Sequence, residues 1–501
     1  MKKATLIFML CLLGGGILFY WIYARMQKSQ PAPIAVSVET SSPGFTISPR
    51  MMGLSYETSL LCADSAGHHY FTPDDQALVN LFKTIGIKNL RIGGSSLDAL
   101  RLPVPTESDI ESLFEFAKKA DVKVLYSVRL ADSKEYPLAL NIQQATMAAK
   151  LIHEKYREQL DLFAMGNEPW YFLRDHDAYV AKWKIFRDAI VSVCPDARFC
   201  AADEGPSPDL IRKMANAYGG DEGRLVTISQ HSYPFGSSYQ GPVTAENRDS
   251  IQPFDAAEAR ARMLSPEVYE IYEKIYRDII EAIDESPLPF RFTECNSYSS
   301  SGLKGASDSY ASALWAVDYM HWWAKHGVDG MNFHTGNRTG GELNFVCRYA
   351  AFRTGKNGYD VYPLSYGMKF FDLGAQGKTL PTAVDTEMNP HIAAYATTPD
   401  GKTVLVTLIN KSFGPDAKPQ TIKIRPDRPL AEADLQTIAL TARNNDVSGS
   451  VGDVMLGGKP IQEDGTWNGQ WNRLSASAVT NNEIEIKMAP ASAVIVKFQI
   501  K

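Results

Sequence analysis

The stretch "FAMGNEPW" (163–170) sets a carboxylate directly behind a run of apolar residues. The run predicts a buried strand that ends at Gly166, so that Asn167 and Glu168 follow at its carboxyl end. Seven further apolar runs of similar length occur along the chain, and segments with apolar residues at helical spacing separate them. The eight runs are MMGLSYE (51–57), NLRIGG (89–94), VKVLYSV (122–128), LDLFAMG (160–166), RFCAAD (198–203), LVTISQHSY (225–233), FRFTECN (290–296) and GMNFHTG (330–336).

Eight units in which a strand precedes a helix predict an α/β fold, a (β/α)8 TIM barrel, over residues 49–345. A doubly wound open sheet is the alternative for this order of elements. Such a sheet usually carries a phosphate-binding glycine loop after its first strand, and GLSYETSLL (53–61) is not such a loop. We therefore expect the barrel.

The chain beyond Tyr349 has a different pattern. HIAAYATTPDGKTVLVTLIN (391–410) predicts two strands around a Pro-Asp-Gly turn, and more alternating runs follow up to the last residues. Together they predict an appended antiparallel β-sandwich over residues 346–501. Residues 35–48 predict a β-hairpin that joins this sandwich, which would then be built from both ends of the chain.

The first residues predict export. Residues 4–24 are uncharged and lie between the basic pair Lys2-Lys3 and Arg25. Their length is close to the about 20 residues that span a bilayer, so residues 1–34 are expected to hold a membrane anchor or a signal segment, followed by a linker. The predicted barrel would then lie outside the cytoplasm, periplasmic or extracellular. It would be held at the membrane by the apolar segment, or secreted if that segment is cleaved.

Charge and cysteine content restrict the possible partners. A net charge of −6 and a pI near 5.9 argue against a nucleic-acid binder, which normally carries a basic surplus. The five cysteines outside the apolar segment show no CxxC motif and no Cys/His cluster, so neither a zinc site nor a disulfide scaffold is predicted. Cys194 and Cys200 could pair in an oxidising compartment, and isolated thiols are the alternative.

Two carboxylates occupy the places where barrel enzymes carry their chemistry, which are the carboxyl ends of the strands. Glu168 follows the fourth strand and Glu294 ends the seventh, so they can face each other across the barrel mouth. A pair of this kind is what glycosidic hydrolysis needs, with one acid to protonate the leaving oxygen and one carboxylate at the anomeric carbon. Arg91, on the second strand, could hold Glu294 ionised, because a nearby cation lowers the pKa of a carboxyl group. A structural ion pair is the alternative role for Arg91.

Seven motifs stand in a characteristic order from about residue 35 to the end of the chain. They are GLSYE (53–57), LRIGG (90–94), GNEP (166–169), HSY (231–233), TECNSYSSSG (293–302), GMNFHTG (330–336) and PLSYGMKFF (363–371). In this order they resemble glycoside hydrolase family 79, the heparanase and β-glucuronidase family, within the clan of retaining (β/α)8 glycosidases. The resemblance implies Glu168 as acid/base, Asn167 on the 2-hydroxyl of the sugar and Glu294 as nucleophile, with no metal and no cofactor.

The same resemblance implies a set of sugar-binding residues. His231 and Tyr233 match positions that hydrogen-bond near the nucleophile, and a structural role for His231 is the alternative. Hydroxyls of Tyr233 and Tyr298 and the backbone amide of Gly336 would bind a sugar carboxylate. Such neutral donors bind it without a cation that competes for the catalytic carboxylates.

Two departures from the family pattern affect the identity of the sugar. Tyr298 follows the nucleophile by four positions, whereas relatives are expected to have five. HTGNRTGG (334–341) lacks a tyrosine often found after the last strand, so Asn337 or Arg338 could substitute. Glu57 and Asp98 lie at strand ends and would either bind sugar hydroxyls or belong to the surface.

The predicted function is that of an exported retaining β-glycosidase that removes β-linked glucuronic acid from glycans or glycoconjugates. One alternative is an endo-acting, heparanase-like hydrolase of glycosaminoglycans, although a long sulfated chain favours a basic trough and this chain is acidic. Xylosides or arabinosides are further possible substrates. A non-catalytic glycan-binding surface protein would be expected to lack one of the two carboxylates. The oligomeric state is not predicted.

Overall fold

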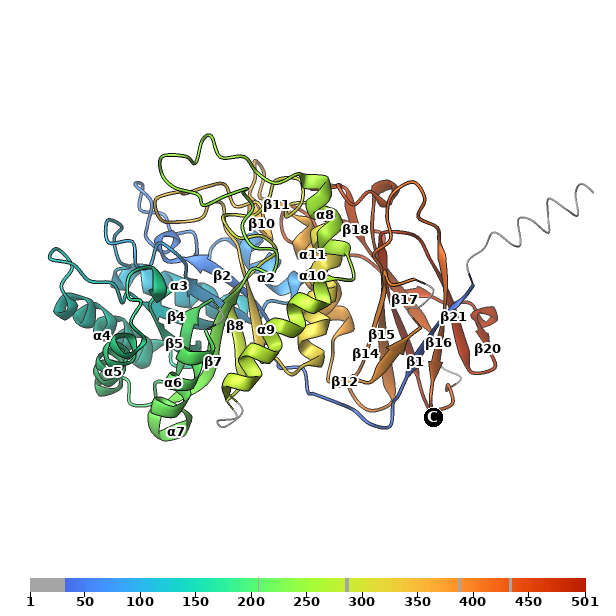
Figure 1. Ribbon diagram of the computed structural model, residues 1–501, viewed down its shortest axis with the longest axis horizontal. Helices are drawn as coiled ribbons and strands as arrows, with labels where there is room; N and C mark the ends of the chain where they lie inside the picture. The colour runs from blue at the N-terminus through green and yellow to red at the C-terminus, as the bar shows by residue number, and fades with distance from the viewer. Residues whose placement is uncertain (1–31, 206, 284–287, 386–388, 432–434) are drawn as a thin grey trace, which may run out of the picture.

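The computed structural model describes residues 32–205, 207–283, 288–385, 389–431 and 435–501. A closed barrel of eight strands lies beside the two sheets of a sandwich (Figure 1), and a two-stranded hairpin forms a further small sheet. The apolar segment 4–24, for which an anchor or a signal is predicted, lies outside the described residues. Within them, no helix combines the length and the apolar character that crossing a membrane requires.

The predicted (β/α)8 barrel is confirmed. Its strands are β2 (Met52–Glu57), β3 (Asn89–Gly93), β4 (Lys123–Val128), β5 (Leu160–Met165), β6 (Phe199–Glu204), β7 (Leu225–Ser232), β8 (Phe290–Cys295) and β9 (Gly330–His334). Neighbouring strands pair in parallel in chain order, and β9 pairs with β2 to close the barrel. Both faces of these strands are covered, which explains why they occur in the sequence as continuous apolar runs.

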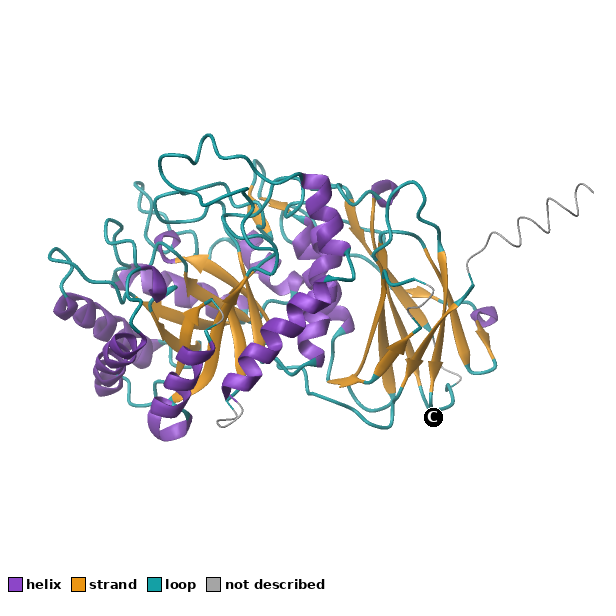
Figure 2. Cartoon of the chain, viewed as in Figure 1, coloured by secondary structure: helices purple, strands orange, loops and turns teal. Residues whose placement is uncertain are grey.

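Helices surround the barrel (Figure 2). They are α2 (Gln76–Ile85), α3 (Glu107–Ala120), α4 (Leu138–Lys155), α5 (His176–Val193), α6 (Pro208–Tyr218), the short α7 (Gly220–Gly223), α8 (Ala256–Leu264), α9 (Val268–Ile283), α10 (Tyr310–Lys325) and α11 (Pro363–Gly374). Side-chain caps fix several starts: Asp75 accepts from the backbone N–H of Leu78, and Thr106 forms a reciprocal capping box with Asp109. Each cap satisfies a backbone N–H in the first turn of its helix and so fixes where that helix begins.

Helix α10 is buried on all sides from Tyr310 to Ala324. Its Trp323 ring meets the ring of Phe292 on β8 edge-on, with 4.7 Å between the ring centroids. The aromatic residues of α10 therefore serve packing around the barrel.

Helix α11 packs against α10 and α2 and so belongs to the helices around the barrel. The predicted boundary at residue 345 falls before this helix, and β12 (Lys378–Leu380) is the first strand of the sandwich sheets after it. The α11 sequence shows no apolar stripe because the helix is buried on nearly every side. The hairpin of β10 (Phe352–Thr354) and β11 (Tyr359–Val361) precedes it.

Two sheets form the sandwich. One contains β13 (Thr382–Val384), β1 (Ile34–Val38), β16 (Gln420–Pro426), β21 (Glu483–Met488) and β20 (Val479–Thr480). The other contains β12, β14 (Ile392–Thr398), β15 (Thr403–Asn410), β22 (Ser492–Gln499), β17 (Gln436–Ala442), β18 (Val454–Leu456) and β19 (Asn472–Arg473). Apolar residues from both sheets, among them Val36 and Val406, form one core cluster.

The predicted hairpin at 35–48 is wrong, although this segment does join the sandwich. β1 is a single strand that pairs antiparallel with β13 and parallel with β16. The backbone beyond it bonds elsewhere, since the N–H of Gly44 donates to the carbonyl of Thr379 over 2.8 Å. The sandwich therefore contains one parallel pair. Because β1 comes from before the barrel, no short turn forces it to run antiparallel to β16.

A buried ion pair joins the barrel to the sandwich. Asp318 on α10 accepts from the ammonium of Lys411 over 2.7 Å and from the hydroxyls of Tyr395 and Tyr269 over 2.6 and 2.9 Å. Both charged side chains are almost fully buried. Since a buried charge without its partner is strongly unfavourable, this contact fixes the two parts to each other.

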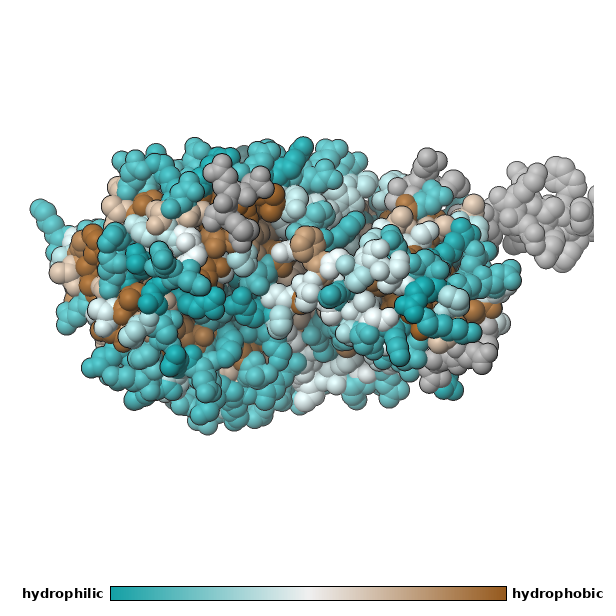
Figure 3. Space-filling view, turned by 90° about the horizontal axis from the view of Figure 1, so that it is seen from below, coloured by the Kyte–Doolittle hydropathy of each residue, from teal (hydrophilic) through white to brown (hydrophobic). Residues whose placement is uncertain are grey.

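The surface on the side where the barrel strands begin is mostly hydrophilic, and its hydrophobic residues lie in separate patches (Figure 3). The long loops after the strands gather at the opposite end (Figure 1). In barrels of this type the carboxyl ends of the strands carry the site, so the site is sought there.

Candidate functional site

Glu168 and Glu294 meet at the carboxyl ends of β5 and β8. A carboxylate oxygen of each and a ring nitrogen of His231 all lie within 4.8 Å of one another. The two carboxylates differ in exposure, since the side chain of Glu294 is 9% exposed and that of Glu168 is 19% exposed. The structure thus brings together the pair that the strand-end rule predicts.

Glu294 is surrounded by groups that favour its ionised form. The guanidinium of Arg91 donates to Oε2 over 2.7 Å, and the hydroxyl of Tyr233 donates to Oε1 over 2.7 Å. His334 Nδ1 lies 3.5 Å from Oε2. Burial alone would raise the pKa of Glu294, but His334, His231, Arg91 and the Tyr233 hydroxyl hold that pKa well below its ordinary value.

Arg91 is fully buried and donates to four side chains. Besides Glu294, it donates to Asn167 Oδ1 over 2.8 Å, to Asp203 Oδ2 over 2.9 Å and to Ser55 Oγ over 3.1 Å. A Cβ on Gly93 would lie 2.4 Å from the guanidinium carbon, so the glycine in LRIGG makes room for this side chain. Arg91 therefore fixes the relative positions of strands β3, β5, β6 and β8.

Glu168 has a different environment. Its backbone lies in the left-handed region with φ 48°, and its N–H donates to the carbonyl of Asp203 over 2.8 Å. A non-glycine residue in this region is strained, and such residues gather at functional sites. His231 Nδ1 lies 3.1 Å from Oε1 of Glu168. The other ring nitrogen faces Arg91 at 3.4 Å. Because a guanidinium only donates, this contact favours a proton on Nδ1, where it faces Glu168.

Asp203 and His334 belong to the site although sequence reasoning did not select them. Asp203 accepts from Arg91 and, over 2.6 Å, from the hydroxyl of Thr293. His334 lies between Glu294 and Glu57, 3.5 Å from each. Burial lowers the pKa of His334, yet these two carboxylates raise it above its ordinary value. Asp203 ends a predicted strand, so the rule that singled out Glu168 and Glu294 could have found it. His334 ends β9, but the predicted strand ran on to Gly336.

Glu57 lies beside this group and is buried. Its Oε2 accepts from the backbone N–H and the hydroxyl of Ser96 over 2.8 and 2.6 Å. A Cβ on Gly94 or Gly340 would come within 2.5 Å of this carboxylate, so both glycines allow the backbone to approach it. Burial opposes ionisation of Glu57, but His334 and Ser96 lower its pKa below the ordinary value.

Three other residues predicted to bind the sugar, Tyr298, Asp98 and Gly336, form no hydrogen bond or ion pair with Glu168 or Glu294 in the described part of the chain. Tyr298 points away from Glu294: it stacks on Phe235 with 5.1 Å between ring centroids, and its hydroxyl donates to the carbonyl of Ala259 over 3.3 Å. Asp98 accepts three backbone N–H groups, including that of Asn167 over 2.7 Å, and so positions the loop of Asn167. Gly336 follows β9 with φ 133°, a conformation that favours glycine.

A cavity of about 430 Å³ opens beside Glu57. Arginines 101, 248 and 338 line it together with Glu57 and Glu342. Two of the arginines also bind its loops: Arg248 donates to the carbonyl of Leu343 over 3.1 Å and Arg338 to that of Asn344 over 3.0 Å. The cavity thus carries more cations than anions in a protein whose net charge is −6.

Two groups of the described residues hold donors close enough for one metal ion. In the first, which comprises Glu168, His231 and Glu294, Arg91 and Tyr233 already bond both oxygens of Glu294. Both oxygens of this carboxylate are thus already bonded within the protein.

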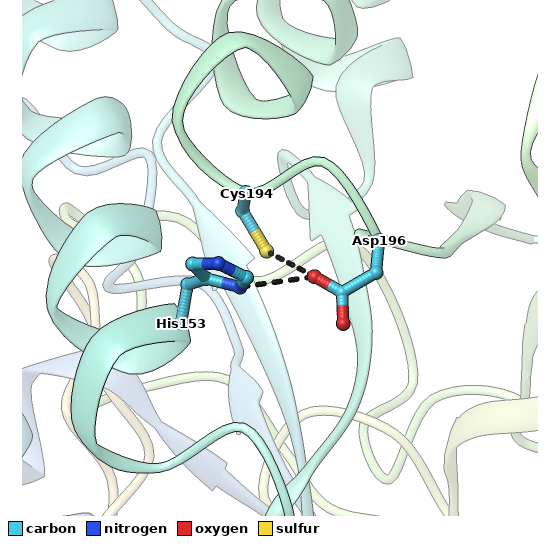
Figure 4. A group of neighbouring side chains, drawn as sticks. All are labelled: His153, Cys194 and Asp196. Atoms are coloured by element: carbon cyan, nitrogen blue, oxygen red, sulfur yellow. Dashed lines mark hydrogen bonds and ion pairs between the residues drawn. The ribbon is translucent and has the colours of Figure 1, made fainter.

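The second group is His153, Cys194 and Asp196 at the ends of α4 and α5 (Figure 4). Asp196 Oδ1 lies 2.9 Å from His153 Nδ1 and accepts from the Cys194 thiol over 3.6 Å, while Arg157 pairs with the other oxygen. Burial and the charge of Asp196 raise the pKa of Cys194 to about 11. The carboxylate is thereby satisfied without a metal. Cys194 and Cys200 are free thiols.

The fold and the paired carboxylates at the strand ends define a barrel-plus-sandwich protein of the type found among glycoside hydrolases. A 4-O-α-L-rhamnosyl-β-D-glucuronidase from Fusarium oxysporum is 18% identical, with a TM-score of 0.69 over 92% of this chain and 99% of its own. The GH51 arabinofuranosidase from Xanthomonas axonopodis pv. citri is 15% identical, with a TM-score of 0.64 over 93% of this chain and 100% of its own. A monomeric β-xylosidase from Caulobacter crescentus is 14% identical, with a TM-score of 0.61 over 94% and 100%.

At these identities the likeness is one of fold, and it covers both the barrel and the sandwich. No protein-family model and no curated protein sequence matches the chain. The chemistry is therefore argued from the site itself.

Proposed function

We propose that this protein is a glycoside hydrolase that retains the configuration of the anomeric carbon. The observation that carries the proposal is the separation of Glu168 and Glu294, whose nearest oxygens lie within 4.8 Å. Retaining enzymes hold their carboxyl groups about 5–5.5 Å apart, whereas inverting enzymes need about 6.5–9.5 Å to admit a water molecule. The distance supports direct attack by one carboxylate.

The environments assign the two roles. Glu294, held ionised by Arg91, Tyr233 and His334, attacks the anomeric carbon, while Glu168 gives its proton to the leaving oxygen. This step forms a covalent glycosyl-enzyme. In the second step Glu168 takes a proton from a water molecule that attacks the anomeric carbon, and Glu294 leaves as a carboxylate.

Asn167 and His231 support these two groups. The amide oxygen of Asn167 accepts from Arg91, which directs its NH2 group away from the guanidinium and leaves it to donate to a sugar hydroxyl. His231 donates to Glu168 and so keeps the acid/base oriented as its proton leaves and returns.

We further propose β-linked glucuronic acid as the sugar, removed from the end of a glycan or glycoconjugate. The ordered motifs of the sequence support this choice, and so does the shared fold with a rhamnosyl-glucuronidase. The cavity beside Glu57 adds three arginines, which suit an acidic substrate. Tyr298 has no part in this proposal, since its hydroxyl bonds to Ala259.

The test is hydrolysis of p-nitrophenyl β-glucuronide beside the β-glucoside, the β-xyloside and the α-L-arabinofuranoside. Glu168→Gln and Glu294→Gln are compared with Glu485→Gln, which changes an exposed carboxylate on β21. Activity on the glucuronide alone, with the β anomer as first product by NMR and abolished in Glu294→Gln, is the expected result.

Other outcomes separate the parts of the proposal. Activity on a neutral sugar would keep the carboxylate pair and refute the uronate assignment. An inverted first product, or a fully active Glu294→Gln variant, would refute the mechanism. Cleavage of polymeric heparan sulfate without cleavage of any small glycoside would favour an endo-acting enzyme instead.

We also propose that the protein is exported and held at a membrane, with the barrel outside the cytoplasm. The basic pair Lys2-Lys3 and the uncharged residues 4–24 support this. Protease should degrade the barrel in intact cells if it is extracellular, or once the outer membrane is opened if it is periplasmic. Protection of the barrel until the cytoplasmic membrane is broken would contradict export.

A further inference from the structure

Three aromatic side chains lie exposed directly after Glu168 in the chain. Trp170, Tyr171 and Phe172 are 42%, 65% and 39% exposed. Among the described residues only four other large hydrophobic side chains are exposed, and no two of those are adjacent in the chain. Exposed apolar surface gathered at one place commonly marks a binding site, whereas single exposed side chains need no explanation.

Local structure ties these rings to the backbone of Glu168. Pro169 begins η2 (Pro169–Tyr171), a 3₁₀ helix of one turn. The N–H of Tyr171 donates to the carbonyl of Glu168 over 3.1 Å. The rings of Trp170 and Tyr171 stack with 3.8 Å between centroids and 29° between planes. Partial desolvation and the charges of Glu168 and Glu294 raise the pKa of Tyr171 to about 12. The stacked pair thus directly follows Glu168, and the backbone of Tyr171 is hydrogen-bonded to that of Glu168.

The chemistry proposed above decides which part of a substrate reaches this pair. Glu168 protonates the leaving oxygen, so the leaving group lies on its side of the scissile bond. Glu294 lies with Arg91 and His334 on the side of the sugar ring that is attacked. The segment that follows Glu168 therefore borders the leaving group.

We propose that Trp170 and Tyr171 bind the leaving group, and that this group carries a ring with an apolar face. The C–H face of a pyranose and the face of an aryl ring share this property, and both gain by stacking on an aromatic side chain. This inference rests on the proposed function, because it takes Glu168 as the acid. It makes the two aromatic residues determinants of the leaving group and leaves the choice of the hydrolysed sugar to other residues.

The test compares three glycosides of the sugar that the wild-type protein hydrolyses best: the methyl glycoside, the p-nitrophenyl glycoside and a disaccharide with a pyranose as leaving group. Trp170→Ala and Tyr171→Ala are measured against wild type, so that the intrinsic reactivity of each leaving group cancels. Tyr171→Phe keeps the ring. Phe45→Ala is the matched control, because it also removes an exposed aromatic ring, 54% exposed. This ring lies against Gly327, just before the start of β9, whereas the site lies at the ends of the strands.

Each alanine variant should lower kcat/KM about 2- to 10-fold on the disaccharide, on the aryl glycoside or on both, because one stacking contact is lost. The same variants should leave the methyl glycoside within about twofold of wild type. Tyr171→Phe and Phe45→Ala should behave as wild type on all three. A loss confined to the disaccharide would identify a sugar as the leaving group, and a loss confined to the aryl glycoside an aromatic aglycone.

Equal losses on the methyl glycoside and the ring-bearing substrates would overturn the inference, because they would mean a general disturbance of Glu168. Full activity of both alanine variants on every substrate would also overturn it while leaving the proposed hydrolase intact. A wild-type protein that cleaves none of the glycosides would instead refute the proposed function, and the inference with it.

Discussion

Replacing Tyr233 with phenylalanine should move the pH dependence of catalysis. The hydroxyl of Tyr233 donates to Oε1 of Glu294 over 2.7 Å, and Tyr233→Phe removes this bond while keeping the ring. A hydrogen bond to a charged group contributes about 1.5–3 kcal/mol. Because one pKa unit corresponds to about 1.4 kcal/mol, the pKa of Glu294 should rise by about 1–2 units.

The sign follows from the proposed role of Glu294 as the nucleophile. A protonated carboxyl group cannot attack the anomeric carbon, so activity is lost as the pH falls through its pKa. Raising that pKa moves the loss to higher pH. The pKa of Glu294 is lower in the folded than in the unfolded protein, so its charge stabilises the fold at every pH above the unfolded pKa. Tyr233→Phe should therefore lower the free energy of unfolding near pH 7 by about the 1.5–3 kcal/mol that the lost hydrogen bond contributes.

The assay is kcat/KM for the preferred p-nitrophenyl glycoside from about pH 2 to 8, because the pKa of Glu294 starts well below its ordinary value. Reactions are quenched with base, and circular dichroism at each pH confirms folding. Tyr298→Phe is the matched control, because its hydroxyl bonds to the carbonyl of Ala259 instead of a carboxylate. The acid limb should move by about 1–2 units in Tyr233→Phe and stay in place in Tyr298→Phe. An unmoved limb in Tyr233→Phe, or equal shifts in both variants, would refute this account of Glu294.

Further predictions concern the acid, the interface and the buried histidine. Glu168→Gln should slow cleavage of poor leaving groups by about 10²–10⁴-fold and that of a dinitrophenyl glycoside far less, because the latter needs no proton; steady-state rates check this, and equal losses would contradict it. Lys411→Met should cost about 3–5 kcal/mol in urea unfolding because Asp318 is left buried and unpaired, and adding Asp318→Asn should restore part of the loss. The pKa of His334 is higher in the folded than in the unfolded protein, so its charge stabilises the fold at pH values below the unfolded pKa. This stabilisation is lost as the pH rises through the pKa of the folded protein. Urea unfolding from pH 6 to 9 should show a smaller decline in His334→Gln than in wild type, and identical slopes would exclude this role.

Sequence patterns predicted the barrel and its two carboxylates because both depend on local signals. A strand buried on both faces is a continuous apolar run, and Glu168 and Glu294 are found by asking which side chains end such runs. Sequence patterns did not predict helix α11, because a helix that is buried on nearly every side has no apolar stripe. The hairpin prediction for residues 35–48 failed because the partners of β1 lie hundreds of residues away, beyond the reach of any turn signal.

The orientation of Tyr298 was likewise beyond sequence reasoning. The family resemblance implied that its hydroxyl binds the sugar carboxylate, although Tyr298 follows Glu294 by four positions where five are expected. The ring packs on Phe235 instead. A shift of one position along a loop changes the direction of a side chain, and the direction that Tyr298 takes depends on the packing around its loop.

The amino-acid sequence by itself determined the order of strands and helices and the two glutamates at strand ends, because periodicity and strand termini are properties of neighbouring residues. Only the tertiary structure decided how the two glutamates differ. Arg91, Tyr233 and His334 reach Glu294 from three other strand ends and favour its charge, while Glu168 is left with His231 and the more exposed position. A pKa depends on charges and burial in space, and the groups that set it here are brought together by closure of the barrel.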